Sequence, residues 1–270
     1  MTPIFIITFN QSEWLKRSIA SYRALASEID LIVHDNGSDK PEMMDLLANL
    51  EKEGVVVNRG PKITKAEELD NVNISIAKYF DGEFPPIPYV VTDPDIELSD
   101  CDPALLSVFG ELLSRFHWAH CVGPMLRIDD IPTSYPGRIT AINKHIDQFW
   151  RHKPTWIKTE WGRVAYIRAP VDTTFALHRA GHMFRRLRRG VRVYNPFEAR
   201  HLDWYIEKGG VLQTATNISH WANPDMINRV KSAKFEGGSR DFFRVSGAPG
   251  ALVAQQFRAT SEGCDFVATI

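Results

Sequence analysis

The stretch Tyr89-Val90-Val91-Thr92-Asp93-Pro94-Asp95 ends a short apolar run with two carboxylates. The run is rich in β-branched and aromatic residues, which is typical of a buried strand. Proline cannot donate to a central sheet ladder, so Pro94 marks the end of this strand, and it favours an extended backbone at Asp93. Because side chains two residues apart on an extended chain point to the same side, we expect Asp93 and Asp95 to face one point.

Similar apolar runs alternate with amphipathic stretches through the first hundred residues. The apolar runs span residues 4–9, 31–34, 55–57 and 88–92, and the amphipathic stretches span 12–26, 42–51 and 65–79. This alternation predicts an α/β fold with three layers, α/β/α, around a central and mostly parallel sheet. Ligands of such sheets bind beyond the carboxyl ends of the strands, which points to the loops after these four runs.

The alternation of apolar runs with amphipathic stretches becomes less regular in the second half of the chain. The pattern there predicts helices at residues 104–116, 139–150, 185–189 and 202–207, and strands at 118–122, 164–167, 173–177 and 191–194. Residues 223–270 give no clear pattern. We expect one compact unit with three parts, residues 1–125, 126–222 and 223–270.

Composition excludes several classes of protein. The 270 residues carry a formal net charge of −1, and the pI is about 6.8, so no global field attracts nucleic acid. Three cysteines at irregular spacing indicate neither a disulfide framework nor a zinc site, which suggests a cytoplasmic protein. No apolar run reaches the roughly eighteen residues of a membrane span. Four arginines, Arg185, Arg186, Arg188 and Arg189, indicate either a solvated helix end or a peripheral contact with a membrane or phosphate.

Two Asp-x-Asp triplets occur, and chance alone supplies about one in a chain of this composition. Asp102 precedes a proline and an apolar-periodic stretch, so Asp100-Cys101-Asp102 is explained by a helix cap. Asp93 and Asp95 instead follow a buried strand. Hard oxygen ligands without an adjacent thiol suit Mn²⁺ or Mg²⁺, and the alternative is a pair of turn aspartates.

Four segments resemble, in order and spacing, the family 2 glycosyltransferases of the GT-A fold. They are Ile6–Asn10, Leu31–Asp39, Asn58–Gly60 and Val90–Leu98. The resemblance covers residues 3–98 well and the remainder loosely. It implies a Rossmann-like nucleotide-binding half and an acceptor-binding half. It also implies metal-dependent, inverting transfer of a sugar from a UDP-sugar to a hydroxyl of a glycan or lipid-linked glycan, in polysaccharide or glycolipid biosynthesis.

The same resemblance implies a donor site at the strand ends, made of Thr8, Phe9, Asn10, Asp35, Asn58, Arg59 and Asp93. Asp35 matches the position that binds the pyrimidine, and an acceptor-only carboxylate can recognise the ring N–H of uracil. The small residues that usually follow the Asn58 loop are replaced by Pro61–Lys65. Lys62, Lys65 and Arg59 are therefore candidates for diphosphate contact or simply solvated cations.

On the acceptor side, Arg200–Tyr205 stands where the family carries an acidic motif, although the first acid of the usual pair is missing. Asp203 is the expected catalytic base, with a helix-terminal aspartate as the alternative. His220 is the expected third metal ligand beside Asp93 and Asp95; His201 competes with it, and either could be a buried structural histidine. Trp204 and His201 are the expected acceptor contacts.

Two other functions stay open. A sugar-nucleotide pyrophosphorylase would carry a glycine-rich loop after the first strand, whereas Thr8–Ser12 contains no glycine. A sugar-nucleotide-binding module without catalysis is the second alternative. The sugar, the acceptor and the oligomeric state are not indicated by the sequence.

Overall fold

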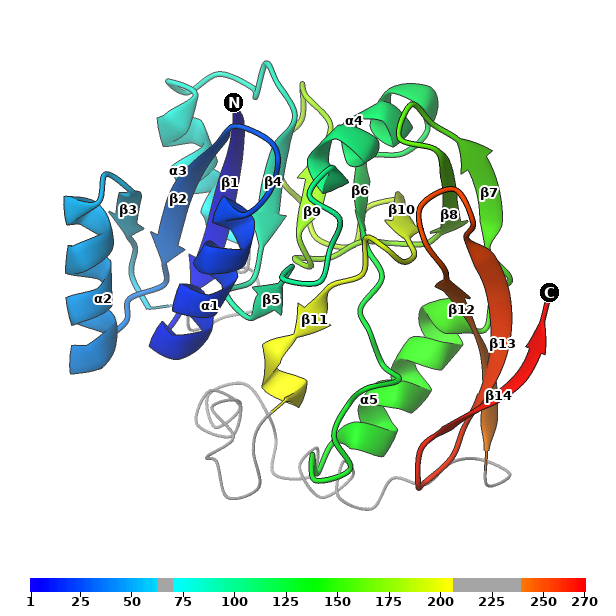
Figure 1. Ribbon diagram of the computed structural model, residues 1–270. Helices are drawn as coiled ribbons and strands as arrows, with labels where there is room; N and C mark the ends of the chain where they lie inside the picture. Colours follow the sequence, from blue (N-terminus) through cyan, green and yellow to red (C-terminus); the bar gives the residue numbers. More distant parts are fainter. Residues whose placement is uncertain (63–69, 206–238) are drawn as a thin grey trace.

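The computed structural model describes residues 1–62, 70–205 and 239–270 (Figure 1). Its largest sheet is built from β1 (Thr2–Thr8), β2 (Ile29–Asp35), β3 (Val56–Arg59), β4 (Tyr89–Thr92), β6 (Cys121–Pro124), β7 (Thr155–Lys158), β8 (Arg163–Arg168), β9 (Ala176–His178) and β10 (Gly190–Val193). Their order is β3-β2-β1-β4-β9-β6-β10-β8-β7. Only β8 and β9 run against the other strands of this sheet. The predicted α/β class with a mostly parallel central sheet is confirmed.

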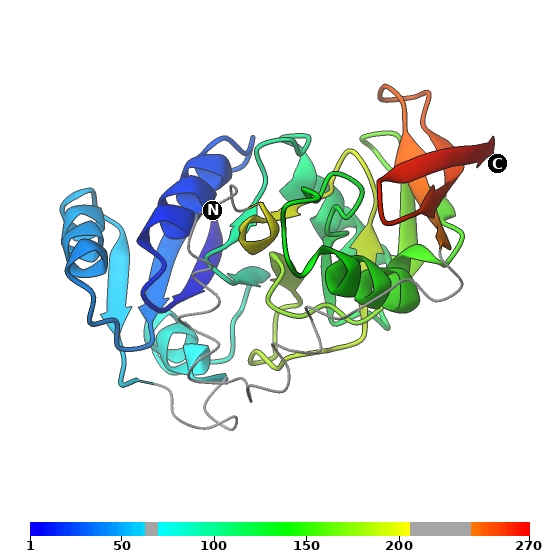
Figure 2. The same ribbon diagram turned by 90° about the horizontal axis from the view of Figure 1, so that it is seen from below.

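The alternation of side chains along β1 produces the layers. Ile4 and Ile6 pack into a core shared with α1 (Ser12–Arg23), α2 (Pro41–Lys52) and α4 (Leu105–Arg115). Phe5 and Ile7 point to the opposite face and pack against α3 (Val72–Tyr79). Figure 2 shows α1 and α2 on one side of the sheet and α3 on the other. Both faces of β1 are buried, which explains its uninterrupted apolar sequence.

Two predicted helices are wrong. Residues 185–189 form a turn, because Leu187 adopts a left-handed backbone conformation (φ 54°) and the Arg186 side chain pairs with Asp172 across the chain. The helix expected at 202–207 is a single 3-10 turn, η3 (Leu202–Trp204), as far as the structure describes it. The helix expected at 139–150 is confirmed as α5 (Arg138–His145), which continues into a π-helical turn, η2 (Ile146–Trp150).

A small antiparallel ribbon, not predicted, joins two distant segments. In it β5 (Ile96–Glu97) pairs with β11 (Arg200–His201), with His201 opposite Ile96. Just beyond the ribbon, the amide of Leu202 donates to the carbonyl of Asp95 at 2.7 Å. The ribbon therefore holds the Asp93–Asp95 segment next to the start of η3.

The last thirty residues also form structure that the sequence pattern missed. Strands β12 (Arg240–Ser246), β13 (Val253–Ala259) and β14 (Cys264–Thr269) make a separate three-stranded sheet. Phe242 packs edge-on against Trp150 of η2, with ring centres 6.2 Å apart. The buried Arg138 of α5 donates to the carbonyls of Thr260 and Ser261, each at 3.2 Å. These contacts fix the sheet against the α5–η2 segment, as Figure 1 shows.

No helix within the described ranges is long and apolar enough to cross a membrane.

Candidate functional site

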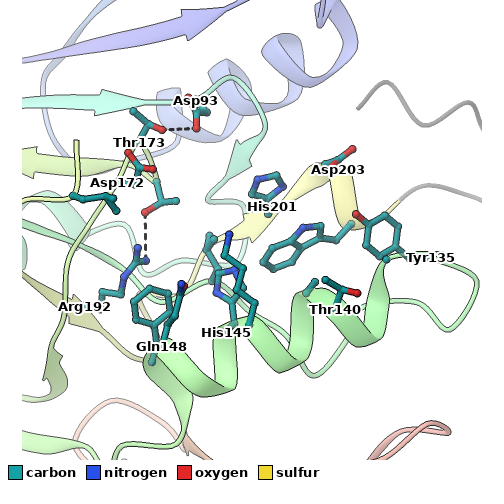
Figure 3. Close-up of a pocket in the computed structure, with 18 residues that line it drawn as sticks. Asp93, Tyr135, Thr140, His145, Gln148, Asp172, Thr173, Arg192, His201 and Asp203 are labelled. Carbon is teal, nitrogen blue, oxygen red and sulfur yellow. Dashed lines mark hydrogen bonds between the residues drawn. The ribbon is translucent and has the colours of Figure 1, made fainter. Parts of the chain in front are cut away.

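Asp93 lies where β4 ends, and it is held there from two directions. Its amide donates to the carbonyl of Thr173 at 2.7 Å, and the Thr173 hydroxyl donates to its carboxylate (Figure 3). Thr173 belongs to the segment before β9, the antiparallel neighbour of β4 in the sheet. The position of this carboxylate is thus set by the sheet itself.

Two cavities meet at Asp93. The smaller one, about 220 Å³, lies at the carboxyl ends of the parallel strands and is lined by Thr8, Phe9, Asn36 and the Asp93–Asp95 segment, among others. The larger one, about 560 Å³, lies toward α5 and is lined by Asp93, Lys144, His145, Arg192, His201, Asp203 and Trp204, among others. Asp93 therefore lines both pockets and lies at the boundary between them.

Asp95 and His201 carry buried polar atoms without hydrogen-bond partners. Asp95 is 6% exposed, and its Oδ1 has no partner. His201 Nδ1, also without a hydrogen bond, lies 3.5 Å from Asp95 Oδ2. Burial raises the pKa of Asp93 and Asp95 and lowers that of His201, so the imidazole is neutral at pH 7. A buried carboxylate at Asp95, a half-buried one at Asp93 and a neutral imidazole next to Asp95 make a favourable environment for a cation.

Among the described residues, no three His, Cys, Asp or Glu side chains form a complete cluster for a metal ion. A divalent cation at Asp93 and Asp95 would therefore take further ligands from a bound substrate or from water, as Mg²⁺ and Mn²⁺ commonly do beside phosphates. The predicted ligand His220 lies outside the described residues.

Asp203 lies in η3 and lines the larger cavity, although it is only 5% exposed. Trp204 next to it is 7% exposed; its ring stacks on His201 (4.8 Å, 10° between planes) and meets His145 edge-on at 4.9 Å. Figure 3 shows His201 and Asp203, with Tyr135 at one end of the cavity. The acidic motif expected from the sequence thus faces the same space as Asp93.

The predicted donor residues divide into two groups. Thr8 and Phe9 line the strand-end cavity, and the buried Thr8 hydroxyl has no hydrogen-bond partner. Lys62 places its ammonium group 5.1 Å from the centre of the Phe9 ring. Asn10 instead braces the neighbouring loop, with its amide bonded to Asp39 and to the backbone of residues 39 and 40.

Asp35, Asn58 and Arg59 do not line that cavity. Asp35 is almost fully buried and accepts from the amide and hydroxyl of Ser38, and burial raises its pKa. Asn58 accepts from Lys78 at 2.8 Å, and Arg59 forms a bidentate pair with Glu51. The structure therefore brings Thr8 and Phe9, but not these three side chains, to the pocket beside Asp93.

The second triplet has structural partners, as its position before a helix indicated. Asp100 lies 2.8 Å from Arg200 and 3.0 Å from Arg127. Asp102 accepts from the amide of Ala104 at 2.9 Å and from the indole of Trp161 at 3.2 Å. These contacts leave Asp93 and Asp95 as the triplet available for a ligand.

Sequence reasoning missed Thr173 and Arg192, which line the larger cavity from the segment before β9 and from β10. The arginine-rich turn also contributes: Arg186 Nη1 lies 3.2 Å from Asp172 and 3.4 Å from the Thr173 hydroxyl. A polar Asp172–Thr174 run before a strand was the available signal, because polar residues at strand ends commonly line sites in α/β folds.

Gly37 controls the approach of the Lys62 loop to the strand-end cavity. It has φ +78°, and a Cβ there would lie 2.6 Å from the Lys62 amide nitrogen. We expect Gly37→Ala to lower the free energy of unfolding by about 2 to 4 kcal/mol, from backbone strain plus this overlap. Gly54→Ala is the matched control, because Gly54 has φ +87° but nothing within 4 Å of its Cβ position. Equal losses for the two variants in urea unfolding would contradict the close approach.

No family model matches the chain, and no curated protein matches it. Among solved structures, the mannosyltransferase PcManGT from Pyrobaculum calidifontis, in complex with GDP-Man and Mn²⁺, aligns at 13% identity and TM-score 0.36, over 48% of this chain and 36% of its own. A structure of S. aureus TarS 1-349 aligns at 9% identity and TM-score 0.45, over 86% and 70%. GalNAc-T7 with UDP, GalNAc and Mn²⁺ aligns at 16% identity and TM-score 0.36, over 47% and 23%.

The chain thus spans about a third of the length of the mannosyltransferase. TM-scores below 0.5 decide neither the fold nor the activity of this chain.

Proposed function

We propose that this chain is a metal-dependent glycosyltransferase that moves a sugar from a nucleotide donor to a hydroxyl of an acceptor. The observation that carries the proposal is the position of Asp93 between two cavities. A transferase must hold a donor and an acceptor on opposite sides of one reacting bond. A carboxylate at the boundary of a strand-end pocket and a larger second pocket satisfies that requirement.

The strand-end cavity is the proposed donor site. Asp93 and Asp95 would hold the divalent cation, and its further ligands would come from the donor diphosphate or from water. When bound, the cation neutralises charge that develops on the departing diphosphate. Thr8 offers an unpaired hydroxyl and Phe9 an aromatic edge to the nucleoside, and Lys62 beside Phe9 supplies a cation for the phosphates.

The larger cavity is the proposed acceptor site, with Asp203 as the base. A carboxylate there accepts the proton of the attacking hydroxyl, and attack from the face opposite the leaving group gives inversion. The Leu202–Asp95 hydrogen bond supports this assignment, because it ties the base and the metal ligands to one backbone unit. Trp204 would contact the apolar face of the acceptor sugar.

The finer features remain predictions. A UDP-sugar donor depends on recognition by Asp35, which is buried under Ser38. His220 as a metal ligand, a role in polysaccharide or glycolipid biosynthesis, and action in the cytoplasm also remain proposals. Since Arg186 pairs with Asp172, a membrane contact would rest on Arg185, Arg188 and Arg189.

Binding of UDP with Mn²⁺ tests the donor site directly. A ligand at a hundred times its dissociation constant adds about 2.7 kcal/mol, which corresponds to a rise in Tm of about 5 to 10 °C. We expect this rise with UDP and Mn²⁺ together, and little change with UDP and EDTA or with Mn²⁺ alone. Equal stabilisation by UDP with and without the metal would contradict the metal site.

Turnover separates the proposed enzyme from the alternatives. We expect slow hydrolysis of a UDP-sugar by the metal-loaded protein when no acceptor is present. UDP binding without hydrolysis or transfer over a panel of donors and acceptors would make the chain a binding module. Release of pyrophosphate from a nucleoside triphosphate would make it a pyrophosphorylase.

A further inference from the structure

The larger cavity contains a buried cation without an anionic partner. Arg192, at the end of β10 nearest this cavity, is 3% exposed. Its Nε donates to the carbonyl of Pro170 and its Nη1 to the carbonyl of Pro124, both at 3.0 Å, and Nη1 also reaches the Thr174 hydroxyl at 3.3 Å. Its guanidinium lies 4.2 Å from the centre of the Phe149 ring. Within the described part of the chain, Nη2 makes no hydrogen bond.

An unpaired buried charge is costly, and proteins usually compensate it with a counter-charge. Burial lowers the pKa of Arg192 to about 10, which leaves the guanidinium protonated at neutral pH. The neutral carbonyls and the hydroxyl around it fix its orientation without neutralising it. Its remaining nitrogen, Nη2, is thus a donor held in place beside an open cavity.

A second cation faces the same space from the helix opposite. Thr140, Lys144 and Gln148 follow one another at four-residue spacing on α5 and its π-helical extension, and all three line the cavity. Lys144 is exposed and forms no ion pair with the described residues. In Figure 3 the labels of Gln148 and Arg192 lie on one side of the cavity, and those of Asp203 and Tyr135 lie on the other.

The carboxylates of this cavity have other partners or other proposed roles. Asp172 pairs with Arg186 at 3.2 Å, Asp93 accepts from Thr173, and Asp203 is the proposed base. None of them lies within ion-pair distance of Arg192 in the described structure. Asp172 acts on Arg192 from a distance, but its carboxylate is bound to Arg186. This end of the cavity therefore holds two cations, Arg192 and Lys144, that form no ion pair with the described residues.

We propose that this end of the cavity, formed by Arg192, Lys144 and Gln148, binds an anionic group of the acceptor, a phosphate or a carboxylate. The identification of the bound molecule as the acceptor rests on the proposed function; the anion site does not. The acceptor would lie along the cavity with its reacting hydroxyl toward Asp203 and its charged group at Arg192. The charge would then orient the acceptor and discriminate against neutral glycans, which leave Arg192 unpaired.

Calorimetric titration with three small probes tests the site without requiring transfer. The probes are methyl phosphate, methyl β-glucuronide and, as the neutral match, methyl β-glucoside. We expect at least one anion to bind about tenfold or more tightly than the glucoside, because hydrogen bonds to charged groups are the strong ones. Comparison of the two anions decides between phosphate and carboxylate. Equal binding of all three probes, or none, would overturn the proposal.

Variants locate the site. Lys144→Gln, at an exposed position, is expected to weaken anion binding about three- to tenfold, and Arg192→Lys, which keeps the charge but loses the rigid fork, about tenfold or more. Lys153→Gln removes an exposed lysine that does not line the cavity and is expected to change nothing. If Arg192→Lys fails to fold, the Lys144→Gln variant still tests the site. Unchanged affinity of Lys144→Gln for the anionic probes would overturn the proposal.

The two proposals can fail separately. Anion binding that depends on Lys144, in a protein that neither binds UDP nor hydrolyses any UDP-sugar, would retain the anion site and refute the glycosyltransferase. Metal-dependent hydrolysis of a UDP-sugar, in a protein that binds no anionic probe, would retain the enzyme and refute the anion site.

Discussion

Asp95→Asn is expected to lower sugar transfer by at least about a hundredfold and to abolish the Mn²⁺-dependent gain in UDP affinity. Asparagine keeps the volume of the buried side chain but removes the charge that would hold the cation, and loss of one charge-stabilising group in a site costs about 10²- to 10³-fold. Initial rates with a UDP-sugar, and titration of UDP with and without Mn²⁺, measure both effects.

The same substitution should leave the metal-free protein at least as stable. Burial raises the pKa of Asp95 in the folded protein above its value in the unfolded chain. The contribution of Asp95 to stability is therefore full below the unfolded-state pKa, and it is lost as the pH rises through the folded-state pKa. At pH 8 with EDTA the wild-type carboxylate therefore destabilises the folded protein, and asparagine removes this destabilisation. We expect an equal or higher Tm for Asp95→Asn under these conditions, which separates lost chemistry from lost folding.

Asp100→Asn is the matched control for this experiment. Asp100 belongs to the other triplet and pairs with Arg127 and Arg200 near the surface. Removing an exposed ion pair costs at most about 1 kcal/mol of stability and should leave the rate within about threefold. If Asp95→Asn retained the full rate with unchanged dependence on Mn²⁺, Asp93-Pro94-Asp95 would be a structural turn.

Asp203→Asn is expected to lower transfer by about 10²- to 10⁴-fold while the stabilisation by UDP and Mn²⁺ stays intact. The amide fits the buried η3 position but cannot accept a proton, and general-base catalysis contributes about this factor. The comparison of kcat with the thermal shift by UDP separates the two roles. A parallel loss of donor stabilisation would place Asp203 in the donor site, and an unchanged kcat would exclude it as the base.

The sequence predicted the parallel half of the fold and the triplet because those signals are local. Each strand there is a continuous apolar run, and Pro94 ends its strand by chemistry contained in one residue. The signal that distinguished the two triplets was also local, because Asp102 comes directly before the start of a helix. The position of Thr8 and Phe9 was also predicted from a local signal, because Thr8 ends β1 and Phe9 follows it, and both residues line the strand-end cavity.

The rest of the site depends on contacts between residues distant in sequence. Thr173 bonds to Asp93 across 80 residues, and no short pattern records such a pairing. Arg186 was assigned to a helix because its cluster of four arginines suggested a solvated helix end, whereas Leu187 turns the chain there and Arg186 pairs with Asp172. The strands of the C-terminal sheet, such as Arg240–Ser246 with the sequence RDFFRVS, form neither a continuous apolar run nor a regular alternation, so their pattern is weak.

The β5–β11 ribbon makes the geometry at Asp95 sensitive to the length of the chain before η3. Because a shift of one residue in a two-stranded pairing reverses the direction of every side chain, a single insertion between Glu198 and Leu202 would turn His201 away from Asp95. Changes to this protein should therefore keep the length of the segment from Glu198 to Leu202 fixed.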